Sequence, residues 1–188
     1  MATTLSHSFE DALAFTARLH ATQTRKGTDI PYFAHLLAVS SLVIMYGGDE
    51  DEAIAGLLHD AMEDQGGRPT LETIRVRFGE RVAAIVDGCT DTDVQPKPPW
   101  RERKERYLDH LKAASPSVKL VAAADKLDNV RSILADHRTQ GASVWSRFTT
   151  RNKADQQWFY RGCVTSLEAG PQSLIRELDA VVQQLERL

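Results

Sequence analysis

The segment from His59 to Asp64 places an imidazole and three carboxylates close together in the sequence. It follows an apolar stretch with helical propensity at positions 55–58. Residues three and four positions apart share a face of a helix, so Glu63 would lie one turn beyond His59 and Asp60. No Lys or Arg within the segment balances these acids, and like charges at this spacing destabilise a helix. A bound cation would convert that repulsion into coordination.

Two further potential metal ligands interrupt apolar stretches with helical spacing. His35 lies early in one of them, and Asp125 follows the apolar run at positions 121–124. Each has a structural alternative, because a lone His on an apolar face is usually a hydrogen-bonded core residue and Asp125 could pair with Lys126 or Arg131. An unpaired buried carboxylate would be costly, so Asp125 needs a partner of some kind.

The set formed by His35, His59, Asp60 and Asp125 supplies two imidazole nitrogens and two carboxylate oxygens from three predicted helices. Such a mixed set suits Mn, Fe, Co, Ni or Zn better than Ca or Mg. In six-coordinate geometry it leaves about two positions for water and a substrate oxygen. We therefore predict one divalent metal ion that lowers the pKa of a bound water and polarises a phosphoryl oxygen.

Glu63 and Asp64 are predicted to lie one turn beyond the metal ligands. At that place they could orient the attacking water or exchange its proton. The alternative is a solvated acidic turn at the end of a helix. We disfavour it, because acids at a helix C-terminus oppose the helix dipole.

Basic residues near these positions are candidates for binding phosphate. Arg25 and Lys26 precede His35 by one short loop, and Arg and Lys are the usual partners of a multiply charged phosphate. A solvated basic loop is the alternative for this pair. In the charged stretch 97–106, Arg101 with Glu105 and Glu102 with Arg106 form i,i+4 pairs typical of an exposed helix face, whereas Lys97 lies outside those pairs. Lys97 is therefore the candidate there for a distal phosphate.

Three further residues could belong to the site or to the core. Asn129 lies one turn after Asp125 and could bind a ribose or phosphate oxygen, or orient the metal ligand. Tyr32 could stack on a base or lie in the core, with equal weight on each. Arg131 is expected to form a structural ion pair.

The elements that must position these residues are helical, since convincing strand alternation is absent. Asp49 and Glu52 have the spacing of a capping box, and Pro116 suits the first position of a helix. The predicted fold is an all-α, single-domain helical bundle covering residues 1–188. The predicted helices cover 8–23, 32–45, 49 to about 66, 70–78, 80–89, 100–114, 116 to about 137, and two final stretches that start at about 153 and at 171, with 141–150 as a connection.

Composition agrees with one domain of ordinary globular character. The chain has 188 residues, of which 42% are hydrophobic and 26% charged. Its net charge of -3 argues against nucleic acid as a partner. Two cysteines cannot form a disulfide framework, and neither a signal peptide nor a membrane span is recognised. These features predict a cytoplasmic protein with no membrane partner, and they leave the oligomeric state open.

The ordered pattern His35, His59-Asp60 and Asp125 resembles the metal-binding signature of the HD-domain phosphohydrolases. The resemblance extends to the hydrolase domain of the Rel/SpoT alarmone enzymes, and especially to the stand-alone small alarmone hydrolases of the metazoan SpoT-homologue type. It covers most of the chain. The further motifs that carry it are Arg25-Lys26 before Pro31-Tyr32, Leu57-Leu58 before the HD pair, Glu63-Asp64, Phe78-Gly79, Thr90-Asp91 and Ala124 to Arg131.

This resemblance implies an HD-type fold and Mn2+-dependent removal of the 3′-diphosphate from the alarmone ppGpp, giving GDP and pyrophosphate. It implies metal binding by the four candidate ligands, and activation of water by Glu63 and Asp64. It also implies a small phosphorylated nucleotide as the partner, bound by Arg25, Lys26 and Asn129, with Ser132 where the family often has Thr. A region resembling the synthetase domain of the long enzymes is absent, so synthesis is not expected.

Departures from the family pattern affect the substrate rather than the metal ligands. Leu36 replaces a Pro common after the first metal His, and Ile30 replaces a common Thr. Two alternatives to alarmone hydrolysis therefore remain. One is an HD phosphohydrolase for another nucleotide, such as a 5′-nucleotidase or an NADPH 2′-phosphatase. The other is a catalytically silent module that binds alarmone, although such modules usually lose ligands or the acidic pair.

Overall fold

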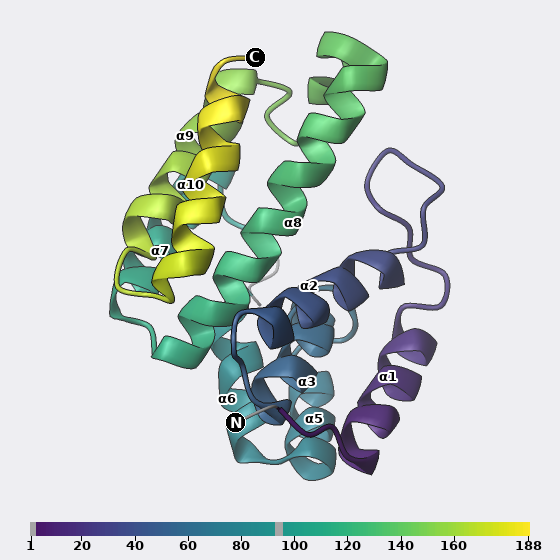
Figure 1. Cartoon of the computed structure of the whole chain (residues 1–188). Helices are drawn as coiled ribbons and strands as arrows, with labels where there is room; N and C mark the ends of the chain where they lie inside the picture. The colour runs from purple at the N-terminus through teal and green to yellow at the C-terminus, as the bar shows by residue number, and fades with distance from the viewer. Residues whose placement is uncertain (1–2, 93–95) are drawn as a thin grey trace.

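The computed structural model describes residues 3–92 and 96–188, and within these ranges every named element is helical (Figure 1). The all-α prediction is confirmed. The elements are α1 (His7–Leu19), α2 (Phe33–Met45), α3 (Glu50–Leu58), α4 (Ala61–Asp64), α5 (Arg68–Phe78), α6 (Glu80–Cys89), α7 (Trp100–Ala113), α8 (Pro116–Gln140), the 3₁₀ helix η1 (Gly141–Arg147), α9 (Lys153–Ser166) and α10 (Gln172–Glu186).

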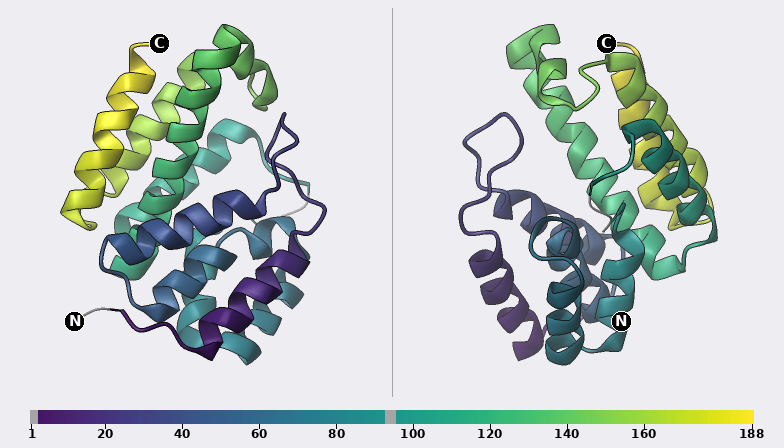
Figure 2. Two further views of the ribbon diagram at one scale, coloured as in Figure 1. Left: turned by 45° about the vertical axis from the view of Figure 1, so that its right-hand side comes forward. Right: turned by 180° about the vertical axis from the view of Figure 1, so that it is seen from behind.

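The long helix α8 lies between two groups of helices (Figures 1 and 2). Helices α2, α3 and α6 pack against it on one side, and α9 and α10 pack against it on the other. Helix α7 joins the second group through α9, and η1 folds back against α8. Because α2, α3 and α8 contact one another in pairs, side chains from three distant parts of the sequence can meet at one point.

Helix starts follow the predicted capping chemistry. The Asp49 side chain accepts a hydrogen bond from the backbone of Glu52, whose side chain bonds back to Asp49, so the capping box is confirmed. The Ser115 side chain caps α8, with Pro116 at its first position. These caps fix where α3 and α8 begin, and therefore which of their residues face the core.

The prediction of one continuous helix from 49 to about 66 is wrong. Helix α3 ends at Leu58, and His59 and Asp60 form a turn before the one-turn helix α4. The Nδ1 atom of His59 lies 2.9 Å from the carbonyl oxygen of Gly56 and hydrogen-bonds to it. That carbonyl is the one that would accept the next backbone N–H of a continuing helix, so the imidazole competes with the helix. Other boundaries also differ, because α1 ends at Leu19 and α8 continues to Gln140.

A close approach of α2 and α3 occurs at Gly56. A Cβ atom added there would lie 3.0 Å from the backbone Cα of Ser40. Ser40 in turn donates a hydrogen bond from its hydroxyl to the carbonyl of Ala53 at 2.8 Å. The absence of a side chain at position 56 thus allows the two helices to pack just before the turn that carries His59.

We expect Gly56→Ala to destabilise the fold by about 1–3 kcal/mol, because the added methyl group meets backbone rather than a movable side chain. It should also weaken metal binding, because pushing α3 away from α2 would move His59 away from His35. Thermal unfolding and a metal-binding titration test both effects. An unchanged melting temperature together with unchanged metal affinity would contradict the close-packing argument.

Within the part of the chain that is described, no helix combines the length and apolar character needed to cross a lipid bilayer. Both cysteines, Cys89 and Cys163, are buried and free. The described core is continuous from α2 and α3 through α8 to α10.

Candidate metal centre

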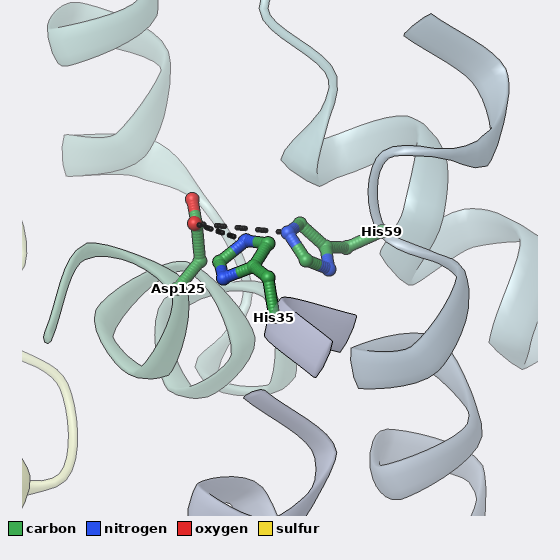
Figure 3. A group of neighbouring side chains, drawn as sticks. All are labelled: His35, His59 and Asp125. Carbon is green, nitrogen blue, oxygen red and sulfur yellow. Dashed lines mark ion pairs between the residues drawn. The ribbon is translucent and has the colours of Figure 1, made fainter. Parts of the chain in front are cut away.

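His35, His59 and Asp125 converge inside this core (Figure 3). They come from α2, from the turn after α3, and from α8, and one ligand atom from each lies within 4.8 Å of the others. The Asp125 Oδ1 atom is 3.3 Å from the Nε2 atom of His35 and 3.7 Å from the Nε2 atom of His59. The three residues are 2%, 2% and 5% exposed, in the order His35, His59 and Asp125.

The two histidines present their Nε2 atoms to this point with no hydrogen-bond partner, although both atoms are buried. Their other ring nitrogens are engaged, with Nδ1 of His35 lying 2.6 Å from Asp128 and Nδ1 of His59 bonded to Gly56. A proton held on Nδ1 leaves the lone pair on Nε2 for a metal. Buried polar atoms rarely stay unpaired, and a divalent cation would satisfy both nitrogens and the carboxylate. The residues therefore fit a bound metal ion.

Asp60 lies beside these three residues. Its Oδ2 atom is 3.1 Å from Nε2 of His59 and 3.9 Å from Nε2 of His35. The hydroxyl of Tyr32 donates a hydrogen bond of 2.5 Å to the same oxygen, and the Tyr32 ring packs edge-on against His35 at 5.3 Å. Tyr32 thus orients a candidate ligand in this structure, a role that the sequence analysis did not consider.

The carboxylates control the protonation of the imidazoles. Burial lowers the pKa of His59, but the neighbouring charges of Asp60 and Asp125 outweigh burial and raise its pKa well above the usual value. The pKa of His35 is raised in the same way, with Asp125 and Asp128 outweighing burial. A metal ion must therefore displace protons from this site, so metal affinity should fall as the pH is lowered.

Asp125 has partners on both carboxylate oxygens. Lys126 forms an ion pair with its Oδ2 atom, and the amide of Asn129 donates a hydrogen bond to its Oδ1 atom. Burial would raise the pKa of Asp125, but the Lys126 charge and the two histidines lower it well below the usual value. Asp125 consequently stays an anion in the interior. The Asn129 amide contacts Asp125, which agrees with one of its two interpretations, while contact with the substrate stays a prediction. Arg131 forms the expected structural ion pair, with Glu177.

Asp128 is a site residue that the sequence analysis missed. Its Oδ2 atom accepts from Nδ1 of His35 at 2.6 Å and from the guanidinium of Arg25 at 3.1 Å. Arg25 also donates to the side-chain oxygen of Asn129 at 3.1 Å. One feature of the sequence could have identified Asp128: it lies three residues after Asp125 and therefore on the same helix face. Arg25 therefore connects the loop after α1 to the residues that orient two ligands.

Glu63 and Asp64 lie in α4, next to the candidate ligands in the chain. The Nζ atom of Lys97 is 2.8 Å from Oε1 of Glu63, so this lysine reaches the acidic pair from the loop before α7. Asp64 accepts a hydrogen bond of 2.8 Å from the side-chain amide of Gln23. Desolvation of its carboxyl, followed by the charge of Asp60, raises the pKa of Asp64 to about 6, although the residue as a whole is exposed.

We expect the Asp64 carboxyl to titrate near pH 6 in the metal-free protein. A raised pKa means that Asp64 binds its proton at higher pH than an ordinary carboxyl. A bound cation should favour the carboxylate and lower the pKa again. Carbon-13 NMR of Asp64, without metal and with the diamagnetic ion Zn2+, measures both states. Titration near the ordinary value of 3.8 without metal would contradict this account.

The candidate phosphate-binding residues Arg25 and Lys26 line a cavity of about 180 Å3 beside Tyr32 and Asn129. Ser132 is not among the lining residues, and its hydroxyl donates to Asp136 at 3.5 Å. The sequence analysis did not assign the other lining residues to a site, and no local spacing pointed to them. They are Ile133, Arg147, Phe148 and Tyr160.

Comparison with known proteins places these features in a family. An HD-domain family profile matches residues 12–153. A Xenopus tropicalis relative named guanosine-3′,5′-bis(diphosphate) 3′-pyrophosphohydrolase MESH1 is 39% identical over 126 residues, which cover 65% of this chain and 68% of the relative. The Drosophila melanogaster protein of the same name is 30% identical over 188 residues, covering 98% of each chain.

A solved structure described as a metazoan orthologue of SpoT that hydrolyses ppGpp superposes with a TM-score of 0.81. It is 27% identical and covers 97% of this chain and 98% of its own. The chain therefore belongs to the HD-domain family, and within it to the group of the MESH1 pyrophosphohydrolases. It is accordingly an enzyme of the hydrolase class.

Proposed function

We propose that this enzyme removes the 3′-diphosphate of ppGpp and releases GDP and pyrophosphate. The observation that carries the proposal is the convergence of His35, His59 and Asp125, with two buried imidazole nitrogens that have no hydrogen-bond partner. The names of the MESH1 relatives, and the described activity of the metazoan SpoT orthologue, support this substrate over other nucleotides.

The metal is proposed to be a single Mn2+ ion, held by His35, His59, Asp60 and Asp125. Two nitrogen and two oxygen donors suit such an ion. When bound, it supplies Lewis acidity and lowers the pKa of water. Hydrogen bonds orient the metal-binding atoms in advance. Asp128 holds the His35 ring, the Gly56 carbonyl holds the His59 ring, and Asn129 holds the Asp125 carboxylate.

Glu63 and Asp64 are proposed to act on the attacking water. Water adds to the phosphorus attached to the ribose 3′ oxygen, the bond between that oxygen and phosphorus breaks, and the 3′ oxygen takes up a proton. Asp64 accepts the proton of the water, and Glu63 orients it.

The nucleotide is proposed to occupy the cavity lined by Arg25, Lys26 and Arg147 with Tyr32 and Phe148. Guanidinium and ammonium groups suit phosphate, and aromatic rings suit a base or ribose. Lys97 is proposed to take a distal phosphate, in exchange for the ion pair that it forms with Glu63. Substrate binding would then release Glu63 for its role with water. For Ser132, a direct contact with substrate stays a prediction from the resemblance.

A small phosphorylated nucleotide is thus the proposed partner. One domain spanning residues 1–188, a cytoplasmic location, and the lack of nucleic-acid and membrane partners stay predictions from the sequence. The oligomeric state stays open.

A product assay tests the proposed function. Purified protein is incubated with Mn2+ and ppGpp, with and without a chelator, and the nucleotides are separated by chromatography. We expect formation of GDP and pyrophosphate that the chelator stops. Protein that contains metal but leaves ppGpp intact would overturn the proposal, and NADPH would be the next substrate to test.

A further inference from the structure

Gln23 lies between α1 and α2 and reaches α4 with its side chain. Its Nε2 atom donates a hydrogen bond of 2.8 Å to Oδ2 of Asp64. The Oε1 atom of the same amide lies 2.6 Å from Nε2 of Gln65 and 2.6 Å from Nδ1 of His20. Gln23 therefore connects three side chains around the acidic pair.

These contacts fix which way the Gln23 amide points. The Gln65 amide donates to the Gln23 oxygen, and the Gln23 nitrogen donates to Asp64. His20 is 2% exposed, and its ring stacks against Tyr32 with the centroids 5.8 Å apart. The backbone N–H of Tyr32 donates to the carbonyl of Gln23 at 2.8 Å, so the backbone of this residue is held as well. The amide is thus a rigid donor rather than a freely rotating surface group.

Without a hydrogen-bond partner, the Asp64 side chain would be poorly ordered, because Asp64 is the last residue of a four-residue helix and is exposed. An exposed side chain at a helix end samples several rotamers. A hydrogen bond from a fixed donor to Oδ2 selects one of them. Oδ1 then remains available to accept a proton.

We propose that Gln23 is a positioning residue for this enzyme, which holds the Asp64 carboxylate toward the water that attacks the 3′-diphosphate. This inference rests on the proposed function. Misplacement of a reacting group by about 1 Å can cost on the order of 100-fold in rate, so the loss of one positioning contact should be visible in kcat.

Two substitutions separate the contacts of Gln23. Gln23→Met has a similar length but removes every hydrogen bond of the amide. Gln23→Glu keeps an oxygen that can accept from His20 and Gln65, and it replaces the donor to Asp64 with a carboxylate. We expect each variant to lower kcat by about 10- to 100-fold with KM and metal content unchanged. If Gln23→Met fails to fold, Gln23→Glu still tests the donor.

The matched control is Gln183, whose Nε2 atom donates to Oδ2 of Asp179 at 2.8 Å within α10. Gln183→Met and Gln183→Glu remove the same kind of bond outside the candidate site. They should leave kcat and KM at the wild-type values. A fall in kcat equal to that of the Gln23 variants would overturn the proposal, because it would show a general effect on the fold.

Crystal structures of the wild type and Gln23→Glu supply a readout that needs no turnover. We expect the Asp64 carboxylate to leave its wild-type position in the variant while His35, His59 and Asp125 stay in place. If the wild type does not hydrolyse ppGpp, the proposed function fails, and the position of Asp64 then decides whether Gln23 holds it. Folded Gln23→Glu with wild-type kcat, or with Asp64 unmoved, would overturn the inference.

Discussion

Asp125→Ala is expected to abolish hydrolysis of ppGpp and retention of the metal while the helical content remains. The substitution removes the carboxylate oxygen that lies 3.3 Å and 3.7 Å from the two histidine Nε2 atoms. It also leaves the partly buried ammonium of Lys126 without its ion-pair partner, so the melting temperature should fall. Metal analysis, a chromatographic product assay and circular dichroism on one preparation measure the three effects.

Asp125→Asn and Asp109→Ala are the controls for this experiment. Asp125→Asn keeps the shape of the side chain and removes its charge, so it should lose metal and activity with less unfolding. Asp109 forms an ion pair with Lys112 on the exposed surface of α7, and its removal should change neither property. Full activity of Asp125→Ala with a normal metal content would show that the metal centre is assigned to the wrong residues.

Helical periodicity was sufficient to predict the fold class, because the helices that carry the ligands have long apolar faces. Local chemistry at Asp49 and Pro116 also predicted two helix starts. The break between α3 and α4 could not be predicted in this way. It depends on a ring nitrogen of His59 that competes for the Gly56 carbonyl, and propensity scales contain no such contact.

The residues that support the candidate site were missed for a different reason. His35 and Asp128 are 93 positions apart, and Gln23 and Asp64 are 41 positions apart. Hydrogen bonds over such separations depend on how whole helices pack, so local spacing in the sequence does not identify the two partners. For Asp128 it gave only the helix face shared with Asp125. The ligands themselves could be found, because an imidazole or a carboxylate within an apolar stretch is conspicuous on its own. The supporting residues lie on polar stretches, where they look like ordinary surface groups.

The double variant Glu63→Gln, Asp64→Asn is expected to bind metal and ppGpp but to hydrolyse the nucleotide slower by a factor of about 10²–10⁴. Neither substitution touches the metal cluster of His35, His59 and Asp125, so metal content should equal that of the wild type. Amides retain hydrogen-bonding capacity but cannot accept the proton of the water at neutral pH. The loss should therefore appear in kcat.

Calorimetric titration of the double variant with ppGpp, and its turnover by chromatography, separate binding from catalysis. Removal of the Glu63 charge also frees Lys97, whose ammonium lies 2.8 Å from that carboxylate, so affinity for the anionic nucleotide should rise. Glu72→Gln is a control that removes a charge from an exposed ion pair with Arg75. Turnover at the wild-type rate in the double variant would exclude Glu63 and Asp64 from the chemistry. Loss of ppGpp binding with the metal retained would instead place the two acids in recognition of the nucleotide, because binding and turnover would then fail together.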